Sequence, residues 1–307
     1  RSKAIYKALP KAYQAAYFEL VDFQVAASSN LYQLYRAQAL NHLYALQGRA
    51  VTHKYADSVR YYYLQDSLLT YRYNKVKAGG KFNHCMDQTH IRYTYWHQPD
   101  RNSLPEVKEI TPSKKPLLGI DAPDTLLLDR LMVSRGLTRR VSVFARSNAP
   151  AKYQIKLVNQ NGRQDFLQIE NPSGVLSPDS AGLDIGFQVN WDQLSAYFAA
   201  SDKKQNTNQL YSATLDITGS GHARKKVVLL LQNENRQDWP HQAYIESDSL
   251  VSMDALGFMS DSVKFSQGIR WTALPGFGKT TGAVTPMPVN FKPLACSTEN
   301  PGLSYRF

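Results

Sequence analysis

The sequence predicts a multidomain fold, α then β: a helical bundle followed by an antiparallel immunoglobulin-like β-sandwich and the start of a second, jelly-roll-like β domain. Apolar residues recur every three or four positions before residue 98 and at every second position after residue 123. Prolines punctuate the stretch between the two patterns, at Pro99, Pro105, Pro112, Pro116 and Pro123. The 307 residues also exceed one ordinary domain. We therefore expect four parts, which are a helical bundle with a polar-aromatic loop (1–98), a linker (99–123), a β-sandwich (124–236) and an incomplete C-terminal β-sandwich (237–307).

Two or three long helices are expected within residues 1–78. Pro10 suits a first helical turn, and Ser28–Asn30 offers a cap for a second helix. Gly48 breaks that helix, and a third helix runs from about Ala50 to Gly79–Gly80. Long helices with short connections are typical of an antiparallel bundle. Fourteen of the 19 tyrosines precede residue 97, and we expect most of them on half-buried helix faces, with sugar stacking open for one or two.

Seven or so short strands are expected between residues 124 and 236, without a helical pattern between them. Alternating runs occur at Arg140–Phe144, Tyr153–Leu157, Leu183–Val189 and Ala213–Ile217. Val227–Leu231 is predicted to be a continuous apolar strand. Clusters of Gly, Pro, Asn and Asp separate these runs, as expected for turns in an antiparallel sandwich.

The last part of the chain predicts strands around an aromatic turn. A strand begins at Ala243–Glu246, and a turn-rich stretch spans Trp271–Lys279. Leu303–Phe307 is predicted to be a strand with nothing after it, so we expect this domain to be cut short. Arg1 stands where an initiator Met is expected, which indicates a segment of a longer protein.

The formal net charge is +11, and it is unevenly distributed. The basic residues form only short runs far apart, which indicates solvated basic faces or a diffuse attraction to an acidic glycan. We expect no nucleic-acid partner, because such proteins concentrate their bases. We also expect no membrane partner, since no apolar run approaches the roughly 18 residues of a membrane helix. Cys85 and Cys296 are expected to be free thiols.

The segment Gly79–Pro99 holds the main candidate site. It combines polar and aromatic side chains that are costly to bury without partners, and the candidates for facing a substrate or an interface are Asn83, His84, Asp87, His90, Tyr93 and Trp96. The alternatives are a satisfied hydrogen-bond network at a domain junction and direct contact with substrate. Alanine at His84 or His90 is expected to weaken activity of a full-length enzyme with little loss of stability. A metal site on His84, Asp87 and His90 would need irregular backbone and a further ligand, so no metal and no cofactor is expected.

Trp271 and Phe277 are the candidates for stacking on a sugar ring, with a place in the core as the alternative for the tryptophan. No Gly-x-Ser-x-Gly motif and no paired carboxylates suggest a self-sufficient active site, so no catalytic residue is assigned within the chain.

Gly79–Pro99 resembles a signature of glycoside hydrolase family 115, the family of the xylan α-glucuronidases. The similar residues are Gly-Gly-Lys-Phe-Asn-His-Cys-Met-Asp-Gln-Thr-His-Ile. Asn30–Tyr35 resembles the family's helical region, and Trp271–Lys279 resembles its C-terminal β domain. Three positions depart from the signature: Phe82 stands where a tryptophan is expected, Cys85 where a methionine is, and Arg92 where a glycine is.

The resemblance implies a secreted or periplasmic bacterial enzyme that removes (4-O-methyl)glucuronic acid from xylan with inversion. It implies that the catalytic carboxylates lie in an N-terminal barrel of the same protein, and that this chain supplies scaffold, homodimer contacts and part of the cleft for glucuronoxylan or a related acidic glycan. Two alternatives remain: a carbohydrate-binding module without catalysis, and a metal-dependent hydrolase using His84, Asp87 and His90.

Overall fold

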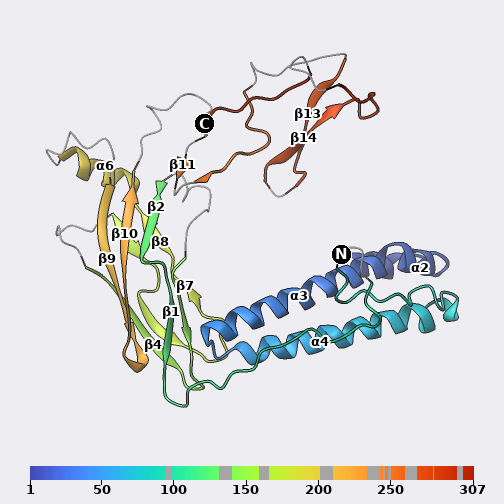
Figure 1. Ribbon diagram of the computed structural model, residues 1–307, viewed down its shortest axis with the longest axis horizontal. Helices are drawn as coiled ribbons and strands as arrows, with labels where there is room; N and C mark the ends of the chain where they lie inside the picture. The colour runs from blue at the N-terminus through green and yellow to red at the C-terminus, as the bar shows by residue number, and fades with distance from the viewer. Residues whose placement is uncertain are drawn as a thin grey trace. The chain divides into compact units, whose positions relative to one another are not determined.

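The computed structural model describes residues 1–94, 98–130, 140–158, 166–200, 210–233, 243–244, 246–247, 250–259, 268–278, 280–295 and 300–307 (Figure 1). These residues fall into two compact units. One unit contains 1–124, 140–189 and 213–228, and the other contains 125–139, 190–212 and 229–307. Helices come first along the chain and antiparallel sheets follow, which confirms the predicted order of α then β.

The first unit contains a hairpin of two long helices, α3 (Phe23–Gln47) and α4 (Thr52–Tyr71), which lie side by side (Figure 1). Shorter helical segments flank them: α1 (Ser2–Ala8), α2 (Lys11–Tyr17), the π-helical turns η1 (Phe18–Asp22) and η2 (Arg72–Val76), and the 3₁₀ turn η3 (Lys77–Gly80). None of the helices in the described part of the chain combines the length and the apolar character needed to cross a membrane.

For the second predicted helix, which corresponds to α3, the predicted end is confirmed and the predicted start is wrong. Gly48 closes α3 in the left-handed conformation at φ 69°, which glycine adopts without strain. Ser28–Asn30 lies inside α3 and caps nothing, because helical structure begins upstream of it. Asn30 uses its amide nitrogen elsewhere and donates to the carbonyl oxygen of Tyr62 on α4 at 2.9 Å.

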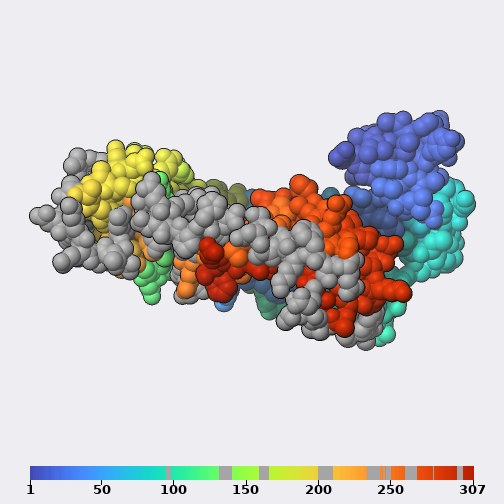
Figure 2. All heavy atoms as spheres, turned by 90° about the horizontal axis from the view of Figure 1, so that it is seen from above, coloured from blue at the N-terminus to red at the C-terminus, as the bar shows by residue number. Residues whose placement is uncertain are grey.

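Two apolar clusters hold the helices and the following loop together. One contains Phe18, Phe23, Tyr73 and Phe82, and the other contains Leu34, Ala37, Val59 and Ile91. Phe82 and Ile91 come from the segment after the helices, so this segment contributes two buried side chains to the helical core. Figure 2 shows the helical residues, blue to cyan, packed against one another.

The sheets that follow are built from antiparallel strand pairs. A five-stranded sheet has the order β2 (Thr125–Asp129), β10 (Ala223–Gln232), β9 (Leu210–Gly219), β4 (Ala151–Val158), β6 (Ser173–Leu176). A three-stranded sheet has the order β1 (Leu118–Asp121), β3 (Ser142–Ala145), β7 (Leu183–Asp184). A further pair joins β5 (Leu167–Ile169) to β8 (Phe187–Val189).

Two predictions for this region are wrong and one is confirmed. The run Leu183–Val189 is divided between β7 and β8, which belong to different sheets. The predicted strand at Val227–Leu231 is confirmed as part of β10, and its residues are alternately buried and more accessible, because only one face packs on the core. A helix, α6 (Trp191–Ala200), occurs where none was expected, and Asn190 caps it by accepting a hydrogen bond from the backbone N–H of Gln193 at 3.1 Å.

The C-terminal residues form two small antiparallel pairs. One joins β11 (Glu246–Ser247) to β12 (Leu250–Val251), and the other is the hairpin of β13 (Arg270–Pro275) and β14 (Gly282–Met287). The predicted terminal strand at Leu303–Phe307 is wrong, since the described residues there make a single bridge from Arg306 to Ala243.

Within the first unit, the turn between α3 and α4 docks on the sheet through stacked side chains. The guanidinium carbon of Arg49 lies 4.6 Å from the ring centre of Tyr44 and 4.0 Å from that of Phe144 on β3. Phe144 in turn covers Gly119 on β1, where a Cβ atom would lie 2.1 Å from the ring. The backbone N–H of Ala50 donates to the carbonyl of Ala145 at 2.9 Å, so a backbone hydrogen bond fixes the same junction.

Candidate functional site

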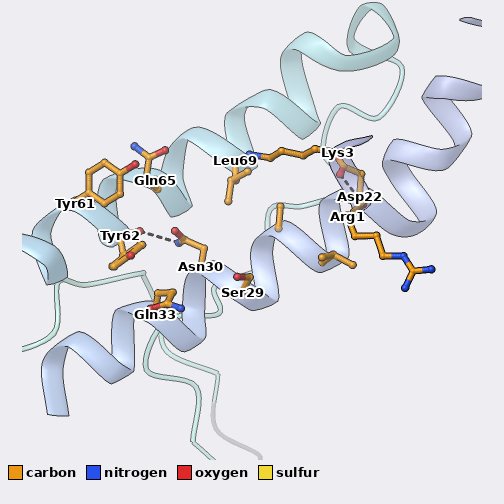
Figure 3. Close-up of a pocket in the computed structure, with 13 residues that line it drawn as sticks. Arg1, Lys3, Asp22, Ser29, Asn30, Gln33, Tyr61, Tyr62, Gln65 and Leu69 are labelled. Atoms are coloured by element: carbon orange, nitrogen blue, oxygen red, sulfur yellow. Dashed lines mark hydrogen bonds between the residues drawn. The ribbon is translucent and has the colours of Figure 1, made fainter. Parts of the chain in front are cut away.

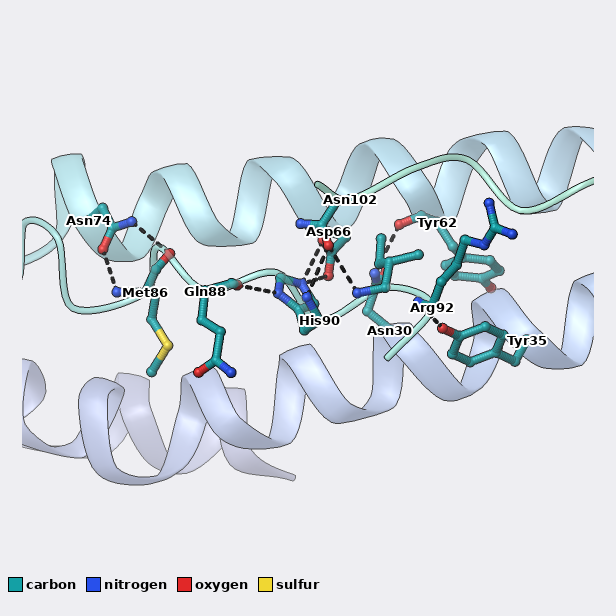
Figure 4. A network of polar contacts seen from close by, with 11 residues as sticks. Asn30, Tyr35, Tyr62, Asp66, Asn74, Met86, Gln88, His90, Arg92 and Asn102 are labelled. Carbon is teal, nitrogen blue, oxygen red and sulfur yellow. Dashed lines mark hydrogen bonds and ion pairs between the residues drawn. The ribbon is translucent and has the colours of Figure 1, made fainter. Parts of the chain in front are cut away.

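Residues 81–94 form an irregular loop that lies against α3 and α4 (Figure 4). Asn74 holds its first half: the Asn74 amide accepts from the backbone N–H of Met86 at 3.0 Å and donates to the Met86 carbonyl at 3.0 Å. The same amide nitrogen lies 3.1 Å from Oδ1 of Asp87. A buried amide that pairs with a backbone N–H and C=O in this way fixes the loop much as a strand partner would.

His90 anchors the middle of the loop on α4. Its Nε2 lies 2.7 Å from both carboxylate oxygens of Asp66, whose side chain is only 4% exposed. Its Nδ1 lies 3.1 Å from the carbonyl oxygen of Gln88. Both ring nitrogens therefore face acceptors, and the imidazolium is the form that satisfies both. The hydrogen bond to Asp66 raises the pKa of His90, against the opposing effect of burial.

Two further contacts hold the end of the loop. Oδ1 of Asn102 accepts from the backbone N–H groups of His90 and Ile91 at 3.0 and 2.9 Å. The backbone N–H of Arg92 donates to the Tyr35 hydroxyl at 2.7 Å. Arg92 itself has φ 68°, a conformation that favours glycine, which is the residue expected there from the family signature.

The structure separates the predicted site residues into two groups. His84 and Asp87 form an exposed pair with Nδ1 and Oδ2 2.6 Å apart, and Asn83 beside them is also exposed. His90 is bound to Asp66, which the sequence interpretation did not nominate. Tyr93 is 42% exposed, and Trp96 lies outside the described residues.

His84, Asp87 and His90 do not converge on one point, because the first two pair with each other and the third with Asp66. Among the residues that the structure describes, no group of three or more His, Cys, Asp or Glu side chains is arranged to hold a metal ion. Cys85 is an exposed free thiol, and Cys296 lies outside the described residues.

Trp271 and Phe277 differ in their accessibility. Trp271 is on β13 opposite Pro286, and its indole nitrogen is buried without a hydrogen-bond partner in the part of the chain that the structure describes. Phe277 is 66% exposed in the turn after β13, between Gly276 and Gly278, both at positive φ. Of the two candidates, Phe277 presents more of its ring to solvent, as stacking on a sugar requires.

An open cavity of about 680 Å³ lies in the same C-terminal segment and was not anticipated from the sequence. Tyr244 is fixed on its wall, because its hydroxyl donates to the carbonyl of Asp254 at 3.0 Å. The backbone N–H of Leu256 and the hydroxyl of Thr281 each lie 2.9 Å from Oδ1 of Asp254. The hydrogen bond from Leu256, followed by one from Thr280, lowers the pKa of Asp254.

Comparison with known proteins identifies this segment. Residues 243–307 match the family described as Glycosyl hydrolase family 115 C-terminal domain, which confirms the family resemblance for this part of the chain. The match includes β13, β14, Phe277 and the cavity beside Asp254. No curated protein is significantly similar to the chain.

Proposed function

We propose that the chain is the C-terminal accessory part of a glycoside hydrolase that removes (4-O-methyl)glucuronic acid from xylan with inversion, because residues 243–307 match the glycosyl hydrolase family 115 C-terminal domain. The catalytic carboxylates belong to an N-terminal barrel of the same protein. The parent enzyme is secreted or periplasmic and acts on glucuronoxylan. The family match is the observation that carries this proposal.

The accessory role includes scaffold, homodimer contacts and part of the substrate cleft. The docking of the helices on β3 supports the scaffold role, because Arg49 and the backbone of Ala50 both attach the α3–α4 turn to that strand. The exposed ring of Phe277 supports a role in glycan contact. The side chains of His84 and Asp87 are 71% and 54% exposed, so they remain accessible to a substrate or to a neighbouring domain.

Glucuronic acid release from glucuronoxylan tests the assignment. The parent enzyme and the 307-residue chain are incubated separately with the polysaccharide, and the released acid is quantified by anion-exchange chromatography. Release by the parent alone is expected, because the bond-breaking residues lie in the barrel. Release by the chain alone, or by neither protein, contradicts the proposal.

A further inference from the structure

A groove of about 380 Å³ lies between α3 and α4, on residues that the proposed function does not use (Figure 3). Its walls are rich in amides and tyrosines: Asn30 and Gln33 come from α3, and Tyr61, Tyr62 and Gln65 come from α4. Asn30 and Gln33 are three residues apart on α3, and Tyr61 and Tyr62 lie four and three residues before Gln65 on α4, so these side chains can reach the same groove.

Asn30 is the fixed point of the groove. It is 8% exposed, and its amide nitrogen donates to the carbonyl of Tyr62. Its amide oxygen has no hydrogen-bond partner among the described residues, and the side chain points across the groove towards α4 (Figure 3). The oxygen itself is not one of the fully buried atoms of the described chain, so it is accessible from the groove and can accept a hydrogen bond there.

Gln33 and Gln65 extend this open polar surface. Neither amide has a hydrogen-bond partner among the residues that the structure describes, so each offers both a donor and an acceptor. Tyr61 is 57% exposed, and its ring meets that of Tyr62 edge-on with the centres 5.3 Å apart. Amides that pair with hydroxyl groups, next to an aromatic ring that covers an apolar face, suit a sugar ring.

The charge at the groove favours an acidic sugar. Lys3 lines it and extends towards Leu69 (Figure 3), and no ion pair involves Lys3 within the described ranges. Asp22 also lines the groove, but it is 5% exposed and its carboxylate accepts a hydrogen bond from Ser2 at 2.8 Å. The accessible charge contributed by these two residues is therefore positive.

We propose that the groove between α3 and α4 is a binding site for a uronic-acid-bearing glycan. The amides of Asn30, Gln33 and Gln65 bind sugar hydroxyls, Tyr61 covers a ring face, and Lys3 pairs with the carboxylate. The glycan class rests on the proposed function, whereas the site itself follows from the groove.

Isothermal titration of the 307-residue chain with an acidic xylo-oligosaccharide tests the site without any hydrolysis. The probe is 4-O-methylglucuronosyl xylotriose, and xylotriose is the neutral comparison. Gln33→Ala and Gln65→Ala are each expected to weaken binding about 5- to 10-fold, since each removes a hydrogen bond. Lys3→Gln is expected to remove most of the preference for the acidic sugar and to flatten the salt dependence of binding.

The helices provide matched controls. Gln24 is an exposed glutamine on α3 outside the groove, and Tyr71 on α4 is 60% exposed, close to the value for Tyr61. Gln24→Ala and Tyr71→Ala are expected to leave affinity unchanged, whereas Tyr61→Ala weakens it. Absence of binding by the wild-type chain, or equal losses in the control variants, overturns the site. If the chain does not bind the oligosaccharide but the parent enzyme releases glucuronic acid, the binding site in the groove is disproved and the proposed function is not affected.

Discussion

At the scale of single residues, the two histidines of the loop have different environments. His84 is 71% exposed and pairs with Asp87, which is also accessible. His90 pairs with Asp66, a buried carboxylate with no other hydrogen-bond partner among the described residues. Removal of His90 would leave that carboxylate buried and unpaired, so His90 contributes to the stability of the loop as well as to any role in binding.

The pair between His90 and Asp66 predicts how stability depends on pH. The pKa of His90 is raised above its ordinary value of 6.5 in the folded state. Its contribution is therefore complete below about pH 6.5 and is lost as the pH rises through the folded-state pKa. The melting temperature of the wild type is expected to fall over that range relative to Asp66→Asn, measured by circular dichroism.

The same measurement separates the two histidines. His90→Ala is expected to lower the free energy of unfolding by about 1–3 kcal/mol at pH 6, because the buried Asp66 carboxylate loses its partner. His84→Ala is expected to change the melting temperature little, since its pair is exposed. Equal effects of the two substitutions would contradict the assignment of His90 as the anchor. This revises, for His90, the sequence-based expectation of little stability loss.

The sequence predicted part of this site. The mixture of polar and aromatic residues after Gly79–Gly80 nominated His84, Asp87 and His90. It did not nominate Asp66, because that residue is 24 positions away from His90 and occupies an ordinary helix position until the loop folds back onto α4. Nor could it show which carboxylate each histidine would face, since that depends on the irregular backbone around His84 and Arg92.

At the scale of elements, the turn at Gly48 determines where the helical hairpin meets the sheet. Gly48 has φ 69°, and a Cβ atom on it would lie 2.9 Å from Nε of Arg146. The turn therefore favours glycine for two reasons, which are its backbone conformation and, more weakly because that side chain is flexible, the nearby guanidinium end of Arg146. Gly79 has a similar φ of 64°, but a Cβ atom there would meet no described atom within 4 Å, so it needs glycine only for conformation.

Comparison of the stability lost in Gly48→Ala with that lost in Gly79→Ala isolates the effect of the Arg146 side chain near Gly48. Both substitutions are expected to lower the free energy of unfolding by about 1–2 kcal/mol, because alanine is strained in the left-handed conformation. Gly48→Ala is expected to cost more, because Arg146 must also move away from the new methyl group. Urea unfolding measures both values, and equal losses would show that the approach of Arg146 is not constraining.

The ends of helices could be predicted from the sequence where a glycine follows the last helical residue. Gly48 and the break near Gly79 were found, because the left-handed residue after a helix has a clear sequence signal. The cap at Ser28–Asn30 was wrong, since helical structure already continues through that point from Phe23. The helix α6 was missed although Asn190 supplied a cap signal, because the alternating strands on both sides dominated the pattern.

At the scale of the whole molecule, the longest basic run in the sequence is partly matched by acids. In the run Arg224–Lys226, Arg224 donates to both oxygens of Asp216 at 2.9 and 2.7 Å. Lys225 pairs with Asp124. The run is therefore no free basic patch, and the net charge of +11 acts as a diffuse field.

This distribution predicts a salt-dependent attraction to acidic glycans. Retardation of the chain by glucuronoxylan in affinity electrophoresis is expected to fall as NaCl rises from about 20 to 200 mM, over which the Debye length shrinks several-fold. Retardation by neutral arabinoxylan is expected to stay constant. Identical salt dependence for the two polysaccharides would contradict an electrostatic contribution.

The stack at the helix–sheet junction has a consequence for evolution. Gly119, Phe144 and Arg49 come from three separate segments, yet the ring of Phe144 fills the space above Gly119 and supports the Arg49 guanidinium. A relative with a side chain at position 119 must therefore carry a smaller residue at position 144, and its arginine would lose one face of its stack. We expect the three positions to covary across homologous sequences, with glycine, phenylalanine and arginine inherited together.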